Sequence, residues 1–593
     1  MNIKLLEYLK RYNFTPNPYT TFFTNLNKDE FLQEVPYLID IEHFNNRLIE
    51  AKTKNHKICI YSDYDADAIT ATAVMYHGLI SLGYDPQNLS YYAPDRFTEG
   101  YGINQKAIKN LAEKNDLIIS VDCGINSTKE ANICLESNCD LIITDHHVLS
   151  GSIPQALAVI NPRLTLDYQN NYLNRKMRES TFEKYFPKQK FVINIHKEWV
   201  SPSVCGVGVA WFSLLHLAHA LDVDLKVLNL LLPFVAIGTI ADCQSILDNQ
   251  NRILVKAGLK TFLPACYSYP GLRELVLQSK TMEKITLGVL SSQDLGFTIA
   301  PILNAAGRID HAHLAIKLLC SLDNEIVEDY TSEIIRINGL RKEMVKQAIE
   351  DSALFDFEKN SLVFMITDYS KGIVGLIASR MVEKYHKMAV VIAKDQNDQS
   401  PESLASASLR APEGYNLVDI MKNINPKLLL KFGGHPQAGG FSCYAKDCEK
   451  IKEEFESILE HYKPQQQAKI DYIPQDLALQ EFNKRPTIYL DSQDINNSLF
   501  DDVSQLEPFG QDFNIPKFLI KITSYQVVVI GKLQNHLKIH LKNISIMYFN
   551  TPEEDKSKLL QNTEVFVLVR LSKNIYKDII TNQLSVEKLV FKQ

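Results

Sequence analysis

The stretch HKICIYSDYDADAITATAVMYHGLISLG, residues 56–83, decides the fold of this chain. An apolar run of strand length comes first, and an apolar segment of helical length follows it. Three aspartates, Asp63, Asp65 and Asp67, occupy alternate positions where the strand should end. Like charges this close repel one another and raise each other's pKa, so the group destabilises the fold unless a cation neutralises it. A metal site is therefore the first hypothesis.

The same alternation of strand and helix continues to about residue 162. Short apolar runs such as DLIISVD and DLIITD alternate with amphipathic segments such as NQKAIKNLAEKN and NSTKEANICLESN. That rhythm predicts βαβ units, and hence a parallel sheet with helices on both faces. In such sheets ligands bind beyond the carboxyl ends of the strands. Polar residues stand at these ends and at the end of a later buried helix, namely Asp122, Asp145, His146, His147 and Asp242.

Carboxylates and imidazoles that arrive from separate strand ends can converge on one or two divalent ions. Oxygen and imidazole ligands suit Mn²⁺ or Mg²⁺ better than a metal that prefers thiolates. Two such ions about 4 Å apart can serve both the attacking and the leaving oxygen of a phosphoryl centre, which predicts hydrolysis of a phosphoester or phosphoanhydride. Each residue also has a structural explanation, because a DxD sequence can be a solvated turn, His146 a core histidine and Asp242 a helix cap. Four separate element ends on one edge are harder to explain in that way.

Length and composition predict a soluble protein of several domains. At about 150 residues per domain, 593 residues predict three or four domains, and 45% hydrophobic with 22% charged residues is typical of globular proteins. No apolar run is long enough for a membrane span and no signal peptide is evident, so we expect a cytoplasmic protein without membrane attachment. The net charge of −7 argues against a chain coated in basic residues for nucleic-acid binding, but it leaves room for a local basic groove.

The ten cysteines, from Cys59 to Cys448, include no CxxC pair, so neither a disulfide framework nor a zinc site is predicted.

The later part of the chain divides into further elements. Residues 164–203 look like a polar surface insertion, and residues 324–353 have the period of one long helix with charges on both faces. A second α/β unit starts at SLVFMITD, and the tail from about residue 471 predicts a small antiparallel barrel. The predicted domains are an N-terminal segment at 1–50, an α/β domain at 51–320, a connecting helix at 321–355, a second α/β domain at 356–465 and a barrel at 470–593.

The motifs also carry a family resemblance. DYDAD, VDCG, TDHH and GTIAD, in this order and at these spacings, resemble the four motifs of the DHH phosphoesterase superfamily. IAPILNAAGRID, GIVGLIASRM, KFGGHPQAGG and LEPFGQDFNIPKF resemble its RecJ family of single-strand-specific exonucleases over nearly the full length. The resemblance implies a parallel-sheet DHH domain, a DHH-associated substrate-binding domain and a C-terminal OB-fold. It also implies a 5′-to-3′ exonuclease that releases 5′-mononucleotides from single-stranded DNA in recombination and repair.

Carried over to this sequence, the resemblance implies two divalent ions, Mn²⁺ or Mg²⁺. One would be held by Asp67, Asp122, His146 and Asp242. The second would be held by Asp63, Asp65 and a bridging Asp122. His147 would face the scissile phosphate, and Asp145 would orient the neighbouring imidazoles. Several relatives carry a histidine ligand at the position of Tyr61, so we expect a weaker first site, or one that fills only with the substrate phosphate.

The resemblance also implies DNA contacts. Glycines let backbone N–H groups approach a phosphate, so we expect Gly433, Gly434 and His435 to form a loop that holds the strand. Further contacts are implied for Arg96, Asn304, Arg308, Arg380 and Arg410. For any one of these arginines alone, a surface salt bridge is the better explanation. Ile302 and Ala411 replace an arginine and a serine that are common in the family, which predicts fewer phosphate contacts there.

Two other functions stay open at this point. One is a phosphodiesterase for short oligonucleotides or cyclic dinucleotides, although such enzymes are shorter and lack the connecting helix and the barrel. The other is an inactive replication scaffold, which loss of the metal ligands would mark. By resemblance we expect a monomer in the bacterial cytosol, with single-stranded DNA, a single-strand-binding protein and a RecQ-type helicase as partners.

Overall fold

The computed structural model describes residues 5, 9, 35–96, 98–100, 102–164, 199–352, 357, 360–395, 398, 400–462, 487–490, 495–523, 525–531, 534–541, 545–561, 564–576 and 578–591. Most of the predicted insertion at 164–203 and of residues 1–34 lies outside these ranges. The chain forms two compact units, one of Met1–Pro301, Ile316–Thr331 and Asp471–Gln593, the other of Ile302–Ala315 and Ser332–Ile470. None of the helices within the described ranges is long and apolar enough to cross a membrane.

Five parallel strands form the first sheet, in the order β2-β1-β3-β4-β5. They are β1 (Ile58–Ser62), β2 (Leu89–Tyr92), β3 (Leu117–Val121), β4 (Asp140–Thr144) and β5 (Ala158–Ile160). Every residue of β1 and β3 is buried, as expected for a sheet covered on both faces. The chain passes from β1 to β2 on one side and then to β3 on the other, so the order reverses between β1 and β3. The crevice that opens at such a reversal is where doubly wound sheets bind ligands.

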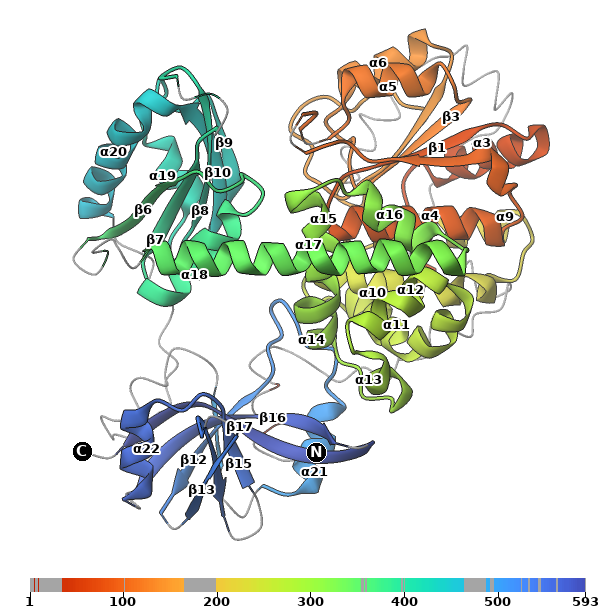
Figure 1. The fold of residues 1–593 in the computed structure, drawn as a ribbon. Helices are drawn as coiled ribbons and strands as arrows, with labels where there is room; N and C mark the ends of the chain where they lie inside the picture. Colours follow the sequence, from red (N-terminus) through yellow and green to blue (C-terminus); the bar gives the residue numbers. More distant parts are fainter. Residues whose placement is uncertain are drawn as a thin grey trace. The chain divides into compact units, whose positions relative to one another are not determined.

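Helices cover both faces of this sheet, which confirms the predicted α/β class (Figure 1). Near one face lie α4 (Ala66–Ser81), α9 (Gly206–Ala220) and α10 (Leu232–Ala241), which pack against one another. α5 (Gln105–Ala112) and α6 (Thr128–Glu136) cover the other, where Ile108 and Cys134 join the core around Ile118. α3 (Ile41–Lys54) packs against β5 and α9. The helices that follow along the chain are α11 (Asn249–Ser268), α12 (Pro270–Gln278), α13 (Met282–Thr286), α14 (Ser292–Asp294), α15 (Ala300–Ile309) and α16 (His313–Cys320).

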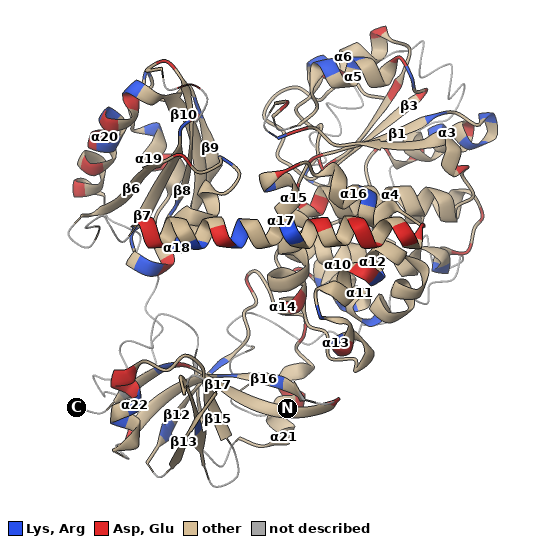
Figure 2. Ribbon diagram, viewed as in Figure 1, with Lys and Arg blue, Asp and Glu red and all other residues tan. Residues whose placement is uncertain are grey.

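The long helix predicted at 324–353 is α17 (Asn324–Asp351), which begins in the first unit and ends in the second. Acidic and basic residues follow one another along it (Figure 2). The second unit holds a five-stranded sheet in the order β6-β7-β8-β10-β9. Its strands are β6 (Leu362–Thr367), β7 (Met388–Ala393), β8 (Leu404–Arg410), β9 (Lys431–His435) and β10 (Ala438–Tyr444). α18 (Val374–Tyr385) packs on one face, and α19 (Leu417–Lys422) and α20 (Cys448–His461) on the other.

The C-terminal region is mainly a seven-stranded sheet in the order β11-β12-β16-β17-β15-β14-β13. The strands are β11 (Thr487–Leu490), β12 (Lys517–Ile522), β13 (Gln526–Ile530), β14 (His536–His540), β15 (Ser545–Tyr548), β16 (Val565–Tyr576) and β17 (Ile579–Phe591). Two short helices accompany it, α21 (Asn497–Ser504) and α22 (Glu553–Leu560). Most neighbours pair antiparallel, as the alternating sequence predicts, but β11 with β12 and β15 with β17 are parallel.

Candidate metal centre

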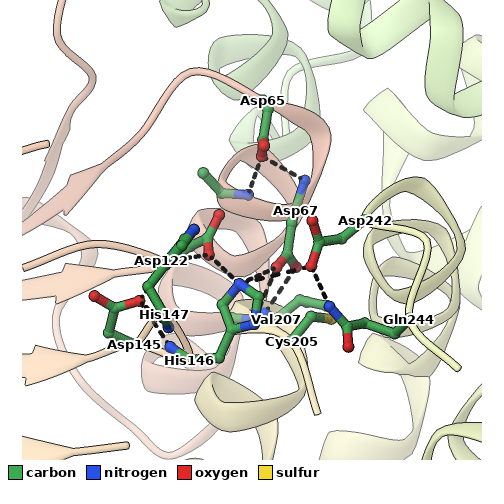
Figure 3. A network of polar contacts seen from close by, with 12 residues as sticks. Asp65, Asp67, Asp122, Asp145, His146, His147, Cys205, Val207, Asp242 and Gln244 are labelled. Atoms are coloured by element: carbon green, nitrogen blue, oxygen red, sulfur yellow. Dashed lines mark hydrogen bonds and ion pairs between the residues drawn. The ribbon is translucent and has the colours of Figure 1, made fainter. Parts of the chain in front are cut away.

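Five of the predicted acidic residues, Asp65, Asp67, Asp122, Asp145 and Asp242, lie close together with His146 and His147 (Figure 3). Asp65 caps α4, because its carboxylate accepts hydrogen bonds from the backbone nitrogens of Asp67 (3.0 Å) and Ala68 (3.1 Å). Asp122 follows β3, and its backbone nitrogen donates to the carbonyl of Thr144 on β4 (2.9 Å). The loops that leave three strands and one helix therefore place their polar residues together.

His146 lies at the centre of this cluster. Its Nε2 is 3.1 Å from Oδ1 of Asp122, 3.6 Å from Oδ2 of Asp242 and 3.9 Å from Oδ2 of Asp67. The 3.1 Å approach is not a hydrogen bond, since Oδ1 of Asp122 is buried without a hydrogen-bond partner among the described residues. One imidazole nitrogen cannot offset the charge of three carboxylates, whereas a divalent cation shared by the four groups would offset most of it. The donor set therefore fits a hard divalent ion.

Asp67 is held in place by the N-terminus of α9. Its Oδ2 accepts a hydrogen bond from the backbone nitrogen of Gly206 (2.7 Å), and its Oδ1 accepts one from Val207 (2.9 Å). A Cβ atom at position 206 would lie 2.5 Å from Cβ of Asp122, so only glycine allows the helix to come this close. The partial positive charge of the helix end also favours the carboxylate.

Asp145 ties the histidine loop to the loop that follows β3, through its two carboxylate oxygens. Oδ1 accepts hydrogen bonds from the backbone nitrogens of His146 (2.7 Å) and His147 (3.1 Å), and it lies 2.8 Å from Nδ1 of His147. Oδ2 accepts a hydrogen bond from the backbone nitrogen of Ile125 (2.9 Å). This is the geometry of a carboxylate that orients neighbouring ligands.

Burial and mutual repulsion disturb the titration of the carboxylates. Burial, and then the neighbouring aspartates, raise the pKa of Asp67 and the pKa of Asp122 well above the ordinary range. Burial and then the charge of Asp65 raise the pKa of Asp242 to about 6, although the hydrogen bond from Gln244 Nε2 (2.6 Å) acts in the opposite direction. Gln244 was not predicted from the sequence. A cation in the cluster would relieve this repulsion.

The two histidines are driven in opposite directions. Burial and the charge of His147 lower the pKa of His146 to about 3, which keeps that ring neutral, as a metal ligand must be. For His147, burial lowers the pKa, but the hydrogen bond and the charge of Asp145 outweigh it and raise the pKa to about 9. The side chain of His147 is 42% exposed, against 7% for that of His146. His147 is thus the more accessible of the pair.

Tyr61 lies in β1, and Asp63 directly follows that strand. Asp63 is 2% exposed, its Oδ1 has no hydrogen-bond partner among the described residues, and burial followed by the charge of Asp65 raises its pKa. The hydroxyl of Tyr61 donates to the carbonyl of Gly102 (3.3 Å) and accepts from the backbone nitrogen of Asn104 (3.0 Å). Burial raises the pKa of Tyr61, so the phenol stays neutral and supports the 102–104 backbone.

Two further residues support the histidine loop and were not predicted from the sequence. Asn161 donates from Nδ2 to the carbonyl of His147 (2.9 Å) and accepts from the backbone nitrogen of Arg163 (2.8 Å). Arg163 donates from Nε to the carbonyl of His146 (2.5 Å). Both residues closely follow β5, so the rule that polar residues gather at the ends of parallel strands could have found them.

The predicted DNA contacts begin in the first unit with Arg96. Its guanidinium lies 4.8 Å from the ring centre of Tyr64, a residue within the acidic turn itself. Asn304 lies half-buried on α15. Ile302 and Ala411, the two departures from the family pattern, are buried at 4% and 8% exposure and therefore pack in the core.

In the second unit, two of the predicted arginines lie against the amino end of α18. Arg308 donates from Nη1 to the carbonyl of Gly372 (3.3 Å), just before the helix begins. A Cβ atom at Gly375, in the first turn of α18, would lie 3.1 Å from Nη2 of Arg410 and 3.0 Å from Oγ of Ser408. Guanidinium groups beside a helix N-terminus suit an anion such as a phosphate.

The remaining predicted DNA contacts are Arg380 and the glycine-rich residues Gly433, Gly434 and His435, which were expected to form a loop. Arg380 lies on the surface and pairs with Glu383 at 2.6 Å. The prediction of a loop for Gly433, Gly434 and His435 was wrong, because these residues lie in the edge strand β9. His435 pairs with Ala438 across a two-residue turn, which draws the glycines into a hairpin. Gly434 has φ 141°, and a Cβ atom there would lie 2.4 Å from the carbonyl oxygen of Ala438.

Comparison with protein families finds three domain matches. Residues 57–239 match the DHH family N-terminal domain, residues 358–461 match the DHHA1 domain, and residues 488–588 match the RecJ OB domain. The first match contains most of the acidic and histidine cluster, and the second contains β9 and the amino end of α18.

Curated relatives point the same way. The chain is 31% identical over 506 residues to the single-stranded-DNA-specific exonuclease RecJ of Bacillus subtilis, covering 84% of this chain and 56% of that protein. It is 29% identical over 533 residues to the RecJ of Haemophilus influenzae, covering 85% of this chain and 82% of that protein. Among solved structures, RecJ of Thermus thermophilus in complex with Mn²⁺ is similar with a TM-score of 0.69 at 23% identity, covering 94% of this chain and 72% of that one. The same protein in complex with Mg²⁺ gives a TM-score of 0.67 at 21% identity, covering 100% of this chain and 75% of that one.

Proposed function

We propose that the chain belongs to the RecJ branch of the DHH family, whose three domain models it matches, and that it is a metal-dependent exonuclease specific for single-stranded DNA. It would degrade the strand from the 5′ end, release 5′-mononucleotides and act in DNA recombination and repair. The observation that carries this proposal is the set of three carboxylates around Nε2 of one buried histidine, beside the carboxyl ends of parallel strands. The chain spans 56% of the length of the Bacillus subtilis relative, so the activity is a proposal for this chain.

The cofactors would be two divalent ions, Mn²⁺ or Mg²⁺, the ions held by the Thermus thermophilus structures. One ion would be held by Asp67, Asp122, His146 and Asp242. The other would be held by Asp63, Asp65 and the bridging Asp122. When bound, two such ions activate a water and stabilise the oxygens that enter and leave the phosphorus. Oδ1 of Asp63 and Oδ1 of Asp122 are buried and have no hydrogen-bond partner within the described ranges, which supports this assignment.

One side chain of the first unit would orient the scissile phosphate, and residues of each unit would contact the DNA backbone. His147, fixed through Nδ1 by Asp145, would donate from its ring to a phosphate oxygen, and its raised pKa favours the charged donor. Arg308 and Arg410 would hold a phosphate at the amino end of α18, with Arg96, Asn304, Arg380 and the β9 residues Gly433, Gly434 and His435 along the strand. The C-terminal OB domain would add affinity for the single strand.

The finer expectations rest on family resemblance. They are a monomer in the bacterial cytosol, with a single-strand-binding protein and a RecQ-type helicase as partners. The domain limits at 50, 320, 355, 465 and 470 also stay predictions. The described part of α3 runs through residue 50 without interruption and packs on the first sheet, so we propose that the first domain begins earlier than 51.

The proposal is tested by a time course with Mn²⁺ on single-stranded DNA labelled at its 3′ end. The matching blunt duplex and the variant Asp122→Asn serve as comparisons, and Asp85→Asn, on an exposed turn outside the cluster, is the matched control. We expect progressive shortening of the labelled single strand by the wild type and the control. The duplex should stay intact, and the Asp122→Asn variant should be inactive.

Two results would replace the proposal. If long strands stay intact while di- or trinucleotides are hydrolysed, the chain is a phosphodiesterase for small substrates. If DNA is bound but nothing is cut with either ion, the scaffold function is correct.

A further inference from the structure

A segment of the C-terminal region docks beside the metal centre. Residues 506–513, LEPFGQDF, lie between α21 and β12, and we call them the docking segment. Ser245 forms a parallel β-bridge with Gln511, and the backbone nitrogen of Ile246 donates to the carbonyl of Gln511 (3.0 Å). The docking segment thus pairs with the loop that directly follows the candidate ligand Asp242.

Arg252, in the first turn of α11, fastens the docking segment from one side. Its guanidinium donates to the backbone carbonyls of Leu506 and, at 2.9 Å, Pro508. It also lies 4.9 Å from the ring centre of Phe513, and the arginine is only 9% exposed. A buried guanidinium needs these acceptors, because an unsatisfied charged group in the interior is costly. The contact therefore ties the start of α11 to the docking segment.

A second set of contacts fastens the docking segment to α14. The carboxylate of Glu507 accepts hydrogen bonds from the hydroxyl of Ser292 (3.0 Å) and from the backbone nitrogen of Phe509 (2.6 Å). The same backbone nitrogen lies 3.0 Å from the Ser292 hydroxyl. Ser292 is 1% exposed, so this polar group is satisfied by the docking segment.

The closest approach is between Gly510 and Ile246. A Cβ atom at position 510 would lie 2.7 Å from Cγ1 of Ile246, a residue with no exposed surface. From another side, a Cβ atom at Gly296 would lie 3.1 Å from Cγ2 of Ile240, in the last turn of α10. Ile240 and Ile246, which stand on either side of Asp242, are therefore each packed against another backbone segment.

Asp242 lies between these two isoleucines in the chain. It ends α10, and its Oδ2 accepts a hydrogen bond from Nε2 of Gln244, next to the bridged Ser245. We propose that the docking segment is a positioning element for Asp242, so that the C-terminal region raises the affinity of the metal centre without supplying a ligand. This inference rests on the proposed function, because it assumes that Asp242 binds the ion. Residues that orient metal ligands change metal affinity when they are altered.

The test measures Mn²⁺ affinity of the full chain without DNA, by electron paramagnetic resonance of the free ion. In the variant Gly510→Ala, the added methyl group must displace Ile246, and we expect Mn²⁺ to bind about tenfold more weakly or worse. KM for single-stranded DNA at saturating Mn²⁺ should stay unchanged. Adding Ile246→Ala to this variant removes the clashing atom and should restore part of the affinity. Gln505→Ala, an exposed neighbour of the docking segment, is the matched control and should bind Mn²⁺ as the wild type does.

A Gly510→Ala variant with wild-type Mn²⁺ affinity, or one in which only KM for DNA rises, would overturn the inference. If that variant does not fold, Arg252→Lys decides, since it keeps the charge but loses the forked contact with the docking segment. It should also bind Mn²⁺ more weakly, and unchanged affinity would overturn the inference. Failure of the proposed metal centre gives a different result. In that case the wild type and the variant Asp242→Asn would bind Mn²⁺ with the same affinity.

Discussion

The acidic cluster should lower the stability of the metal-free protein, and Asp242→Asn tests this. Asparagine has nearly the same shape and keeps an acceptor for Gln244, but it carries no charge. The pKa of Asp242 rises from 3.8 to about 6 on folding, and a shift of about two units corresponds to about 3 kcal/mol. Above pH 6, the variant should therefore be more stable than the wild type by up to about 3 kcal/mol when no metal is bound.

The sign of the pH dependence follows from the direction of the shift. Below about pH 4 the carboxyl is protonated in both the folded and the unfolded chain, so wild type and variant should unfold alike. As pH rises from 4 through 6, the unfolded chain releases its proton first, and the wild type loses stability that the neutral asparagine keeps. The difference should thus grow across this window and stay constant above it.

Urea unfolding in the presence of EDTA, followed by tryptophan fluorescence, measures this difference. Both tryptophans, Trp199 and Trp211, belong to the first unit, so the signal reports on the region that holds the cluster. Asp85→Asn is again the matched control. Added Mn²⁺ should stabilise the wild type more than the variant. A ligand that binds the folded state raises its stability, and the variant should bind Mn²⁺ more weakly because it lacks the charge of Asp242. A variant that is less stable than the wild type in EDTA at pH 7.5 would refute the electrostatic reasoning.

Further predictions concern the same centre. Asp145→Ala removes the anchor of the histidine loop and should weaken Mn²⁺ binding about 10- to 100-fold, as measured by isothermal titration. Gly206→Ala brings a methyl group against Asp122 and should abolish nuclease activity while destabilising the fold by about 1–3 kcal/mol, as measured by urea unfolding. Tyr61→Phe loses two hydrogen bonds to the backbone and should lower the free energy of unfolding by about 1–2 kcal/mol. Its Mn²⁺ affinity should stay at the wild-type value, and weaker Mn²⁺ binding would show that Tyr61 is a ligand. Since Asp242 must be deprotonated to bind an ion, Mn²⁺ affinity should fall as pH drops below about 6, and affinity that is constant from pH 7 to 5 would contradict this.

Much of the metal centre could be predicted because the relevant pattern is local. An apolar run followed at once by an aspartate marks a strand end wherever it occurs, and Asp63, Asp122 and Asp145 all follow this rule. Parallel strands place their carboxyl ends on one edge, so the rule also predicts that these residues meet. The same rule would have found Asn161 and Arg163, had it been applied to the last strand.

Other features depend on contacts that no local pattern contains. The loop predicted for Gly433, Gly434 and His435 is a strand, because the pairing that forms β9 depends on the position of β10 and not on the glycines alone. Glycine-rich sequence shows only that the backbone can adopt unusual angles or approach another group closely. The partner that makes use of this freedom is found only in the folded chain.

The sequence by itself determined the α/β class, the edge of the sheet where the acidic and histidine side chains gather and the kind of ion that such side chains suit, because periodicity and residue chemistry are encoded along the chain. Tertiary structure alone decided how these side chains are held. Asp67 is oriented by the N-terminus of α9, 139 residues away, and the loop after Asp242 pairs with the distant docking segment near the C-terminal sheet. Such contacts arise when separately formed elements pack together, so they depend on three-dimensional shape and not on sequence spacing.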